Sequence, residues 1–123
     1  MTAKRILVVD DDPDVAEAVG RTARRVGFDA MMATSPAEAL DHAALWRPNV
    51  ITMDLRMPDL DGPRFLEALA DRRCDAQILI VSGEDWATIE AARSLGQGLG
   101  LNIAGVIQKP LRLPTLRAAL SSV

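Results

Sequence analysis

The most constraining feature of this 123-residue chain is the alternation of short apolar runs with segments of helical periodicity. Apolar runs of this length, rich in branched residues, are typical of strands buried on both faces of a sheet. Helical segments separate them, and helices supply the crossover connections that parallel strands require. The pattern predicts an α/β fold with helices on both faces of one parallel sheet. The expected strands are Ile6–Val9, Phe28–Ala33, Val50–Met53, Gln77–Val81 and a short one at Val106–Ile107.

Local signals mark the helices between these runs. Asp12 is placed to cap a first helix that begins at Pro13, and Gly27 supplies its C-terminal stop. Ser35 begins a capping box, which predicts a second helix through about Leu45. Three further helices are expected over about Pro63–Ala70, around Trp86, Ile89 and Ala92, and around Leu113, Leu116 and Leu120.

Length and charge limit the classes of protein to which the chain can belong. A chain of 123 residues suits one domain, so residues 1–123 are predicted to form a single unit. Its 14 basic and 17 acidic residues give a net charge of −3, which argues against direct nucleic-acid binding. The single cysteine, Cys74, cannot form an internal disulfide, and no long apolar segment suggests a signal peptide or membrane span. A cytoplasmic protein is expected.

Polar residues of interest follow the predicted strands at the points where those strands end. Asp10 and Asp11 follow the first strand, Asp54 the third, Ser82 the fourth and Lys109 the fifth. All strands of a parallel sheet end at one edge, and ligands bind at that carboxyl edge. These five side chains are therefore expected to lie close together.

The chemistry of this group favours a metal ion and a phosphoryl group. Three neighbouring carboxylates repel one another, and Mg²⁺, for which Mn²⁺ is a possible substitute, is the hard cation expected to relieve this repulsion. An ammonium from Lys109 and a hydroxyl from Ser82 suit the oxygens of a phosphoryl group bound to Asp54. An aspartate can itself accept that group.

These residues, taken in order, resemble the receiver domain of two-component response regulators, the CheY-like family. The resemblance covers essentially the whole chain and implies a doubly wound (βα)5, flavodoxin-like fold with strand order 2-1-3-4-5. It rests on Asp10-Asp11, the loop Asp54-Leu55-Arg56-Met57-Pro58-Asp59-Leu60-Asp61-Gly62, Ser82-Gly83 and Lys109-Pro110.

The resemblance implies a phosphoacceptor rather than an enzyme with substrate turnover. Asp54 would accept a phosphoryl group from a phosphohistidine on a sensor histidine kinase or a histidine phosphotransfer protein. Asp11 and Asp54 would bind Mg²⁺ directly, with Asp10 acting mainly through a water and the backbone carbonyl of Arg56 completing the protein ligands. At most, slow autophosphorylation from small donors and slow autodephosphorylation would accompany signalling.

The resemblance also assigns the remaining site residues. Ser82 and Lys109 would bind the phosphoryl oxygens, and the Lys109–Pro110 peptide bond would be cis. Phosphorylation would draw Ser82 towards Asp54 and shift the fourth helix, fifth strand and fifth helix, which changes the surface offered to an unidentified downstream protein.

The sequence departs from the family pattern in ways that predict altered switching. Val106 stands where many relatives carry an aromatic residue, so a quieter switch is expected. The stretch 96–100, with its three glycines, is interpreted as a loop, with a longer or looser end to the preceding helix. Arg56 and Glu84 carry opposite charges, and we hypothesise that they pair across the site entrance and tune the lifetime of the acyl phosphate.

Two other functions remain open alongside a stand-alone receiver domain whose output is an interaction. One is a receiver-like module that no longer depends on phosphorylation, which Val106 permits but the intact Asp11, Asp54, Ser82 and Lys109 disfavour. The other is a small aspartate-dependent phosphatase. That class is disfavoured because no separate acid or base accompanies the acceptor and no cap domain shelters a substrate.

Overall fold

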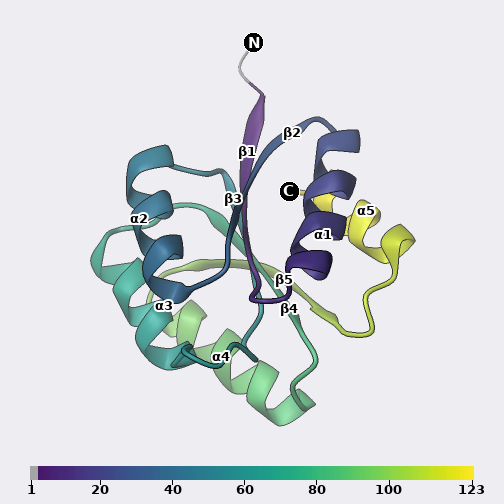
Figure 1. Cartoon of the computed structure of the whole chain (residues 1–123). Coiled ribbons are helices and arrows are strands. Elements are labelled where there is room, and N and C mark those ends of the chain that lie inside the picture. Colours follow the sequence, from purple (N-terminus) through teal and green to yellow (C-terminus); the bar gives the residue numbers. More distant parts are fainter. Residues whose placement is uncertain (1–2) are drawn as a thin grey trace.

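The computed structural model describes residues 3–123, which form one five-stranded parallel sheet (Figure 1). The strand order is β2-β1-β3-β4-β5, which confirms the expected doubly wound fold. Each crossover between parallel strands contains one helix, as the alternation in the sequence predicts. The strands are β1 (Lys4–Val9), β2 (Phe28–Ala33), β3 (Val50–Met53), β4 (Gln77–Ser82) and β5 (Asn102–Gln108).

The helices cover the two faces of the sheet unequally. Helices α1 and α5 pack together on one face, and α2, α3 and α4 line the other (Figure 1). None of the helices in residues 3–123 is long and apolar enough to cross a membrane. The helices are α1 (Pro13–Arg25), α2 (Pro36–Trp46), α3 (Gly62–Asp71), α4 (Trp86–Gly98) and α5 (Leu113–Ser121).

The sheet separates two hydrophobic cores because successive side chains of a strand point to opposite faces. In β1, Ile6 and Val8 pack under α1 and α5, whereas Leu7 and Val9 pack under the three helices of the other face. All four are at most 2% exposed. A strand covered on both faces has no polar face, which explains why these runs are continuously apolar in the sequence.

The predicted helix caps are present. The Asp12 carboxylate accepts hydrogen bonds from the backbone N–H groups of Asp14 and Val15, and Ser35 Oγ accepts one from Glu38. These bonds satisfy N–H groups that have no partner inside the helix. The first of them positions α1 directly after the acidic residues that end β1.

The structure corrects the prediction for the stretch 96–100. Helix α4 continues through Gly98, so most of the expected loop is helical, and β5 extends well beyond the two residues predicted for it. Gly96 is buried, and a Cβ at this position would lie 2.7 Å from Ile103 Cδ1. Any larger residue here would displace the Ile103 side chain, which packs closely between α4 and β5, and local sequence signals do not distinguish this packing role from a loop.

We predict that alanine at these two glycines has opposite effects on stability. Gly96→Ala forces Ile103 to move, and we expect the free energy of unfolding to fall by about 1–3 kcal/mol. Gly98 has no such neighbour within 4 Å, so Gly98→Ala is expected to raise that free energy by up to about 1 kcal/mol through helix propensity. Urea denaturation of both variants measures the difference, and equal effects would contradict this packing role.

Candidate functional site

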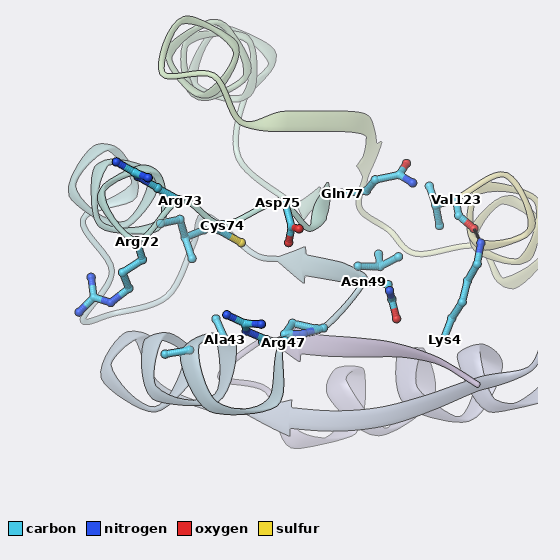
Figure 2. Close-up of a pocket in the computed structure, with 14 residues that line it drawn as sticks. Lys4, Ala43, Arg47, Asn49, Arg72, Arg73, Cys74, Asp75, Gln77 and Val123 are labelled. Atoms are coloured by element: carbon cyan, nitrogen blue, oxygen red, sulfur yellow. Dashed lines mark hydrogen bonds between the residues drawn. The ribbon is translucent and has the colours of Figure 1, made fainter. Parts of the chain in front are cut away.

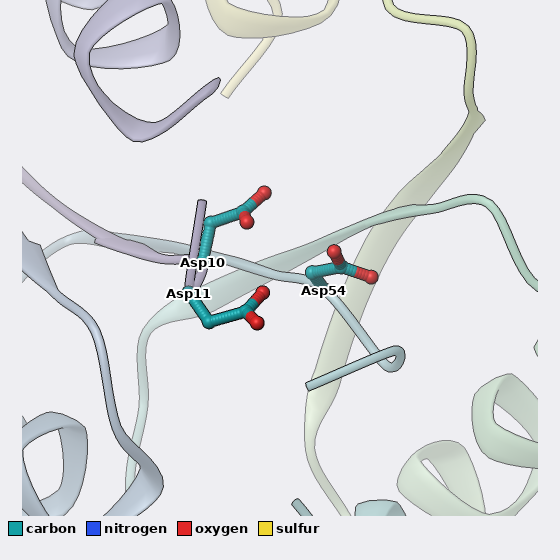
Figure 3. A group of neighbouring side chains, drawn as sticks. All are labelled: Asp10, Asp11 and Asp54. Carbon is teal, nitrogen blue, oxygen red and sulfur yellow. The ribbon is translucent and has the colours of Figure 1, made fainter. Parts of the chain in front are cut away.

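Three carboxylates meet at the carboxyl edge of the sheet. Asp10 and Asp11 directly follow β1, and Asp54 directly follows β3 (Figure 3). One carboxylate oxygen from each residue lies within 4.8 Å of those of the other two. Backbone hydrogen bonds from Asp10 N to Ala33 O (3.1 Å) and from Asp54 N to Val9 O (3.0 Å) hold the strand ends in register. The sheet thus brings together carboxylates that are more than 40 positions apart in the sequence.

Lys109 bridges two of these carboxylates. Its ammonium Nζ lies 2.8 Å from Asp54 Oδ2 and 3.1 Å from Asp10 Oδ2, and 22% of the side chain is exposed. The backbone N–H of Lys109 donates to Ser82 O at 2.8 Å, which joins the ends of β4 and β5. The Lys109–Pro110 peptide bond is cis, as expected. The bond to Asp10 was not predicted, because sequence order does not show which carboxylate a lysine from another strand will contact.

The second oxygen of each buried carboxylate is held by the backbone. Asp10 Oδ1 accepts from Asp12 N, and Asp54 Oδ1 accepts from Arg56 N, both at 2.9 Å. Asp10 and Asp54 are only 4% and 5% exposed, so these bonds replace water that burial removes. The orientation of the Asp54 carboxylate is therefore fixed by Lys109 on one oxygen and by its own loop on the other.

Burial and charge act in opposite directions on the ionisable groups. Burial raises the pKa of Asp10, and the nearby Asp54 adds to this, against the lowering effects of the Asp12 N–H and Lys109. For Lys109, burial lowers the pKa, but hydrogen bonds to Asp54 and Asp10 and their charges outweigh it, so the pKa is raised. The ammonium therefore stays charged beside the carboxylates.

The donor set fits a hard divalent cation. All three side chains offer oxygen ligands, and a single ammonium neutralises only part of their combined negative charge. In residues 3–123, the exposed Asp11 carboxylate takes part in no hydrogen bond or ion pair, so it is available as a ligand. Carboxylate oxygens in this number suit Mg²⁺, which keeps part of its water shell.

The remaining predicted residues surround this group. Ser82 is fully buried, and its Oγ accepts from Glu84 N at 3.2 Å. Arg56 Nε lies 3.2 Å from Glu84 Oε1, so the hypothesised pair forms. Val106 is half-buried and packs against the core under α2, α3 and α4. Gln108 Nε2 also donates to Glu84 O at 3.4 Å, a contact that nothing in the sequence indicates.

We predict that Asp10→Asn stabilises the protein at neutral pH when Mg²⁺ is absent. The folded-state pKa of Asp10 is raised, so above its ordinary value of 3.8 the unfolded state ionises more readily and the folded state is penalised. Asparagine removes this penalty and the repulsion from Asp54. Urea denaturation at pH 7 in EDTA should show a higher midpoint for the variant, with Asp59→Asn unchanged. A lower midpoint for Asp10→Asn would contradict the prediction.

Comparison with known proteins identifies the family that the residues of the site resemble. Residues 6–121 match the response regulator receiver domain family. The transcriptional regulatory protein PrrA of Mycobacterium tuberculosis is 33% identical over 123 residues, which are all of this chain and 51% of that protein. The chain thus spans about half the length of the curated relatives it matches.

Solved structures agree on the fold. The chemotaxis response regulator CheY4 of Vibrio cholerae superposes with a TM-score of 0.81 at 27% identity, and the match covers 98% of both chains. A response regulator protein from Burkholderia pseudomallei, solved with a phosphorylated aspartic acid, a calcium ion and citrate, gives 0.78 at 28% identity. That match covers 95% of this chain and 66% of the other. With its parallel sheet and its acidic site at the carboxyl edge, this chain belongs to the response regulator receiver domain family.

Proposed function

We propose that Asp54 accepts a phosphoryl group from a phosphohistidine and that residues 1–123 act as one phosphorylatable receiver domain. The observation that carries this proposal is the environment of Asp54. It is a buried carboxylate with the Lys109 ammonium 2.8 Å from one oxygen and the Asp10 and Asp11 carboxylates close by. The phosphorylated aspartic acid in the Burkholderia pseudomallei relative supports the same chemistry.

The transfer needs little covalent machinery from the protein. An Asp54 oxygen forms the new O–P bond, the P–N bond of the donor breaks, and the imidazole nitrogen leaves with the electron pair. Lys109 lies where it can pair with the phosphoryl oxygens as charge builds up on them. The Ser82 hydroxyl, which now accepts from Glu84 N, would turn to donate to the same oxygens.

The metal-binding role falls to the acidic residues of the site. Asp11 and Asp54 would bind Mg²⁺ directly, Asp10 would act mainly through a water, and the Arg56 carbonyl would complete the protein ligands. Mn²⁺ is expected to substitute. When bound, the ion neutralises negative charge on the carboxylates and on the incoming phosphoryl group.

The output of the domain would be a change in the surface that a protein partner binds. Movement of Ser82 towards a phosphorylated Asp54 would be transmitted to α4, β5 and α5, since Ser82 ends β4 and is hydrogen-bonded through its carbonyl to Lys109. The donor is a sensor histidine kinase or histidine phosphotransfer protein, and the site of action is the cytoplasm. Turnover of the acyl phosphate would be slow.

Intact-mass measurement after incubation with acetyl phosphate tests the proposal. With Mg²⁺ we expect a gain of one phosphoryl group, and with EDTA we expect none. If acetyl phosphate produces no gain, the same measurement is made with a phosphohistidine donor protein. Failure with both donors would overturn the proposal in favour of a module that acts without phosphorylation.

We further predict that the Arg56–Glu84 pair tunes the lifetime of the acyl phosphate. Arg56 and Glu84 stand two residues after Asp54 and Ser82, and their side chains are 68% and 27% exposed, so neither belongs to the hydrophobic core. Arg56→Ala and Glu84→Ala are each expected to change the dephosphorylation rate by about two- to tenfold, on the scale of a weak ion pair. The double variant should resemble the singles. Parental dephosphorylation rates in all three variants would refute this role of the pair.

A further inference from the structure

The two ends of the sheet differ in how their polar side chains are arranged. A cavity of about 720 Å³ lies at the amino edge, at the starts of β1, β3 and β4. Figure 2 shows the guanidinium groups of Arg72 and Arg73 directed away from this cavity, and Lys4 next to Val123, to whose carbonyl it donates at 2.8 Å. These cations do not converge on one position. At the carboxyl edge, by contrast, polar groups from three segments converge on Glu84.

Glu84 lies in the segment that connects β4 to α4. Ser82 is the last residue of β4, and Asp85 caps α4 by accepting a hydrogen bond from Thr88 N at 2.8 Å. Glu84 thus stands directly before the helix cap. A displacement of Glu84 is therefore passed to the first turn of α4, because the cap ties that turn to Asp85.

Three hydrogen bonds hold Glu84, and they reach it from different segments. Its backbone N–H donates to Ser82 Oγ at 3.2 Å, and its carboxylate accepts from Arg56 Nε at 3.2 Å. Its carbonyl accepts from Gln108 Nε2 at 3.4 Å. Arg56 belongs to the loop after β3 and Gln108 ends β5, and β4 lies between these strands. The two residues therefore bond to Glu84 from opposite sides of β4.

Movement of Ser82 towards Asp54 would draw Glu84 away from Gln108. Asp54 follows β3 and Gln108 ends β5, so a shift towards one is a shift away from the other. A hydroxyl can accept one hydrogen bond while it donates another, so Ser82 Oγ can keep the Glu84 N–H while it bonds to a phosphoryl oxygen. Glu84 then follows Ser82. The bond from Gln108, at 3.4 Å, is already longer than the usual range of about 2.7–3.2 Å, so such a shift breaks it.

We propose that Gln108 is a positioning residue that holds Glu84 on the β5 side and so favours the unphosphorylated arrangement of Ser82 and α4. This inference rests on the phosphoryl transfer proposed for Asp54. Gln108 acts through the Glu84 backbone and the Ser82 hydroxyl rather than by contact with the reacting atoms. Its role is separate from that of the Arg56–Glu84 ion pair, because Gln108 bonds to the backbone carbonyl of Glu84 and not to its carboxylate.

The expected effect follows from the strength of an exposed hydrogen bond. Gln108 is exposed, and one neutral bond of this kind changes the balance between two arrangements by about two- to tenfold. Removing the bond raises the fraction of the protein in which Ser82 can reach a phosphoryl group. The apparent affinity for a ligand of that arrangement rises by up to the same factor.

Titration with beryllium fluoride in the presence of Mg²⁺ tests the proposal, because this complex mimics a phosphoryl group on a carboxylate. The amide chemical shift of Asp54 reports binding. Gln108→Met keeps the length of the side chain and removes the donor, and we expect it to bind the mimic about two- to tenfold more tightly than the parent. Gln97→Met makes the same change at an exposed position of α4 and should bind like the parent. In a Ser82→Ala background, Gln108→Met should have no effect, because the hydroxyl that links Glu84 to the site is missing.

Hydrogen exchange at the Glu84 amide gives a second readout that needs no phosphoryl group. In EDTA, Gln108→Met should speed this exchange about two- to tenfold, since Glu84 moves more readily when its carbonyl is released. The amide of Ile80, inside β4, should exchange at the parental rate. This readout does not depend on Asp54, so failure of the proposed function and failure of this inference can be recognised separately.

Several results would overturn the role of Gln108. They are parental exchange at the Glu84 amide in Gln108→Met, parental affinity of that variant for beryllium fluoride although the parent binds it, and an equal gain of affinity in Gln97→Met. A gain that persists in the Ser82→Ala background would also overturn it, because the effect would then not pass through the Ser82 hydroxyl. If the parent does not bind the mimic, the proposed phosphoryl chemistry fails, and the exchange rate alone decides whether Gln108 holds Glu84.

Discussion

Asp54→Asn is expected to abolish the acceptance of a phosphoryl group from acetyl phosphate in the presence of Mg²⁺. Asparagine keeps the size of the side chain and can still accept the hydrogen bond from Arg56 N through its amide oxygen. It has no carboxylate to act as the nucleophile. The variant therefore isolates the chemistry from the fold, and intact mass should show no gain under conditions that modify the parent fully.

The matched control for this prediction is Asp59→Asn. Asp59 lies in the same loop, five residues after Asp54, and is exposed. Its replacement makes the same change of charge without touching the acidic group at the strand ends. Asp59→Asn should gain one phosphoryl group at the parental rate. Persistent modification of Asp54→Asn would mean that another carboxylate accepts the group, and Asp54 would lose its assigned role.

Lys109→Ala is expected to slow phosphoryl acceptance by about 100- to 1,000-fold, the usual effect of removing one group that stabilises developing negative charge. Lys109 Nζ contacts both Asp54 and Asp10. Its removal leaves the phosphoryl oxygens without their only protein ammonium at this edge of residues 3–123. The rate of mass gain with acetyl phosphate measures the effect, and Arg112→Ala, an exposed cation three residues further on, is the control.

The same substitution is expected to destabilise the fold when Mg²⁺ is absent. Two buried carboxylates lose their cationic partner, and breaking such a contact costs about 3 kcal/mol. Urea denaturation should show that Mg²⁺ stabilises Lys109→Ala more than it stabilises the parent, because the ion replaces the missing positive charge. Adding Asp10→Asn should recover part of the loss. An unchanged midpoint in EDTA would show that the ammonium contributes nothing to stability.

Local sequence determined the fold class and the composition of the acidic site. Continuous apolar runs such as Ile6–Val9 are typical of strands covered on both faces, and helices between such strands favour parallel pairing. In a parallel sheet all strands end at one edge, so the positions of Asp10, Asp54 and Lys109 after their strands were sufficient to predict that they meet.

Only the tertiary structure decided the contacts between segments that are distant in the sequence. Which carboxylates Lys109 bridges depends on its distance and angle across the sheet edge, and the need for Gly96 comes from Ile103 packing against α4. Periodicity in the sequence indicates which face of its own helix or strand a residue occupies. The residues that it contacts on other elements are set by how those elements pack together.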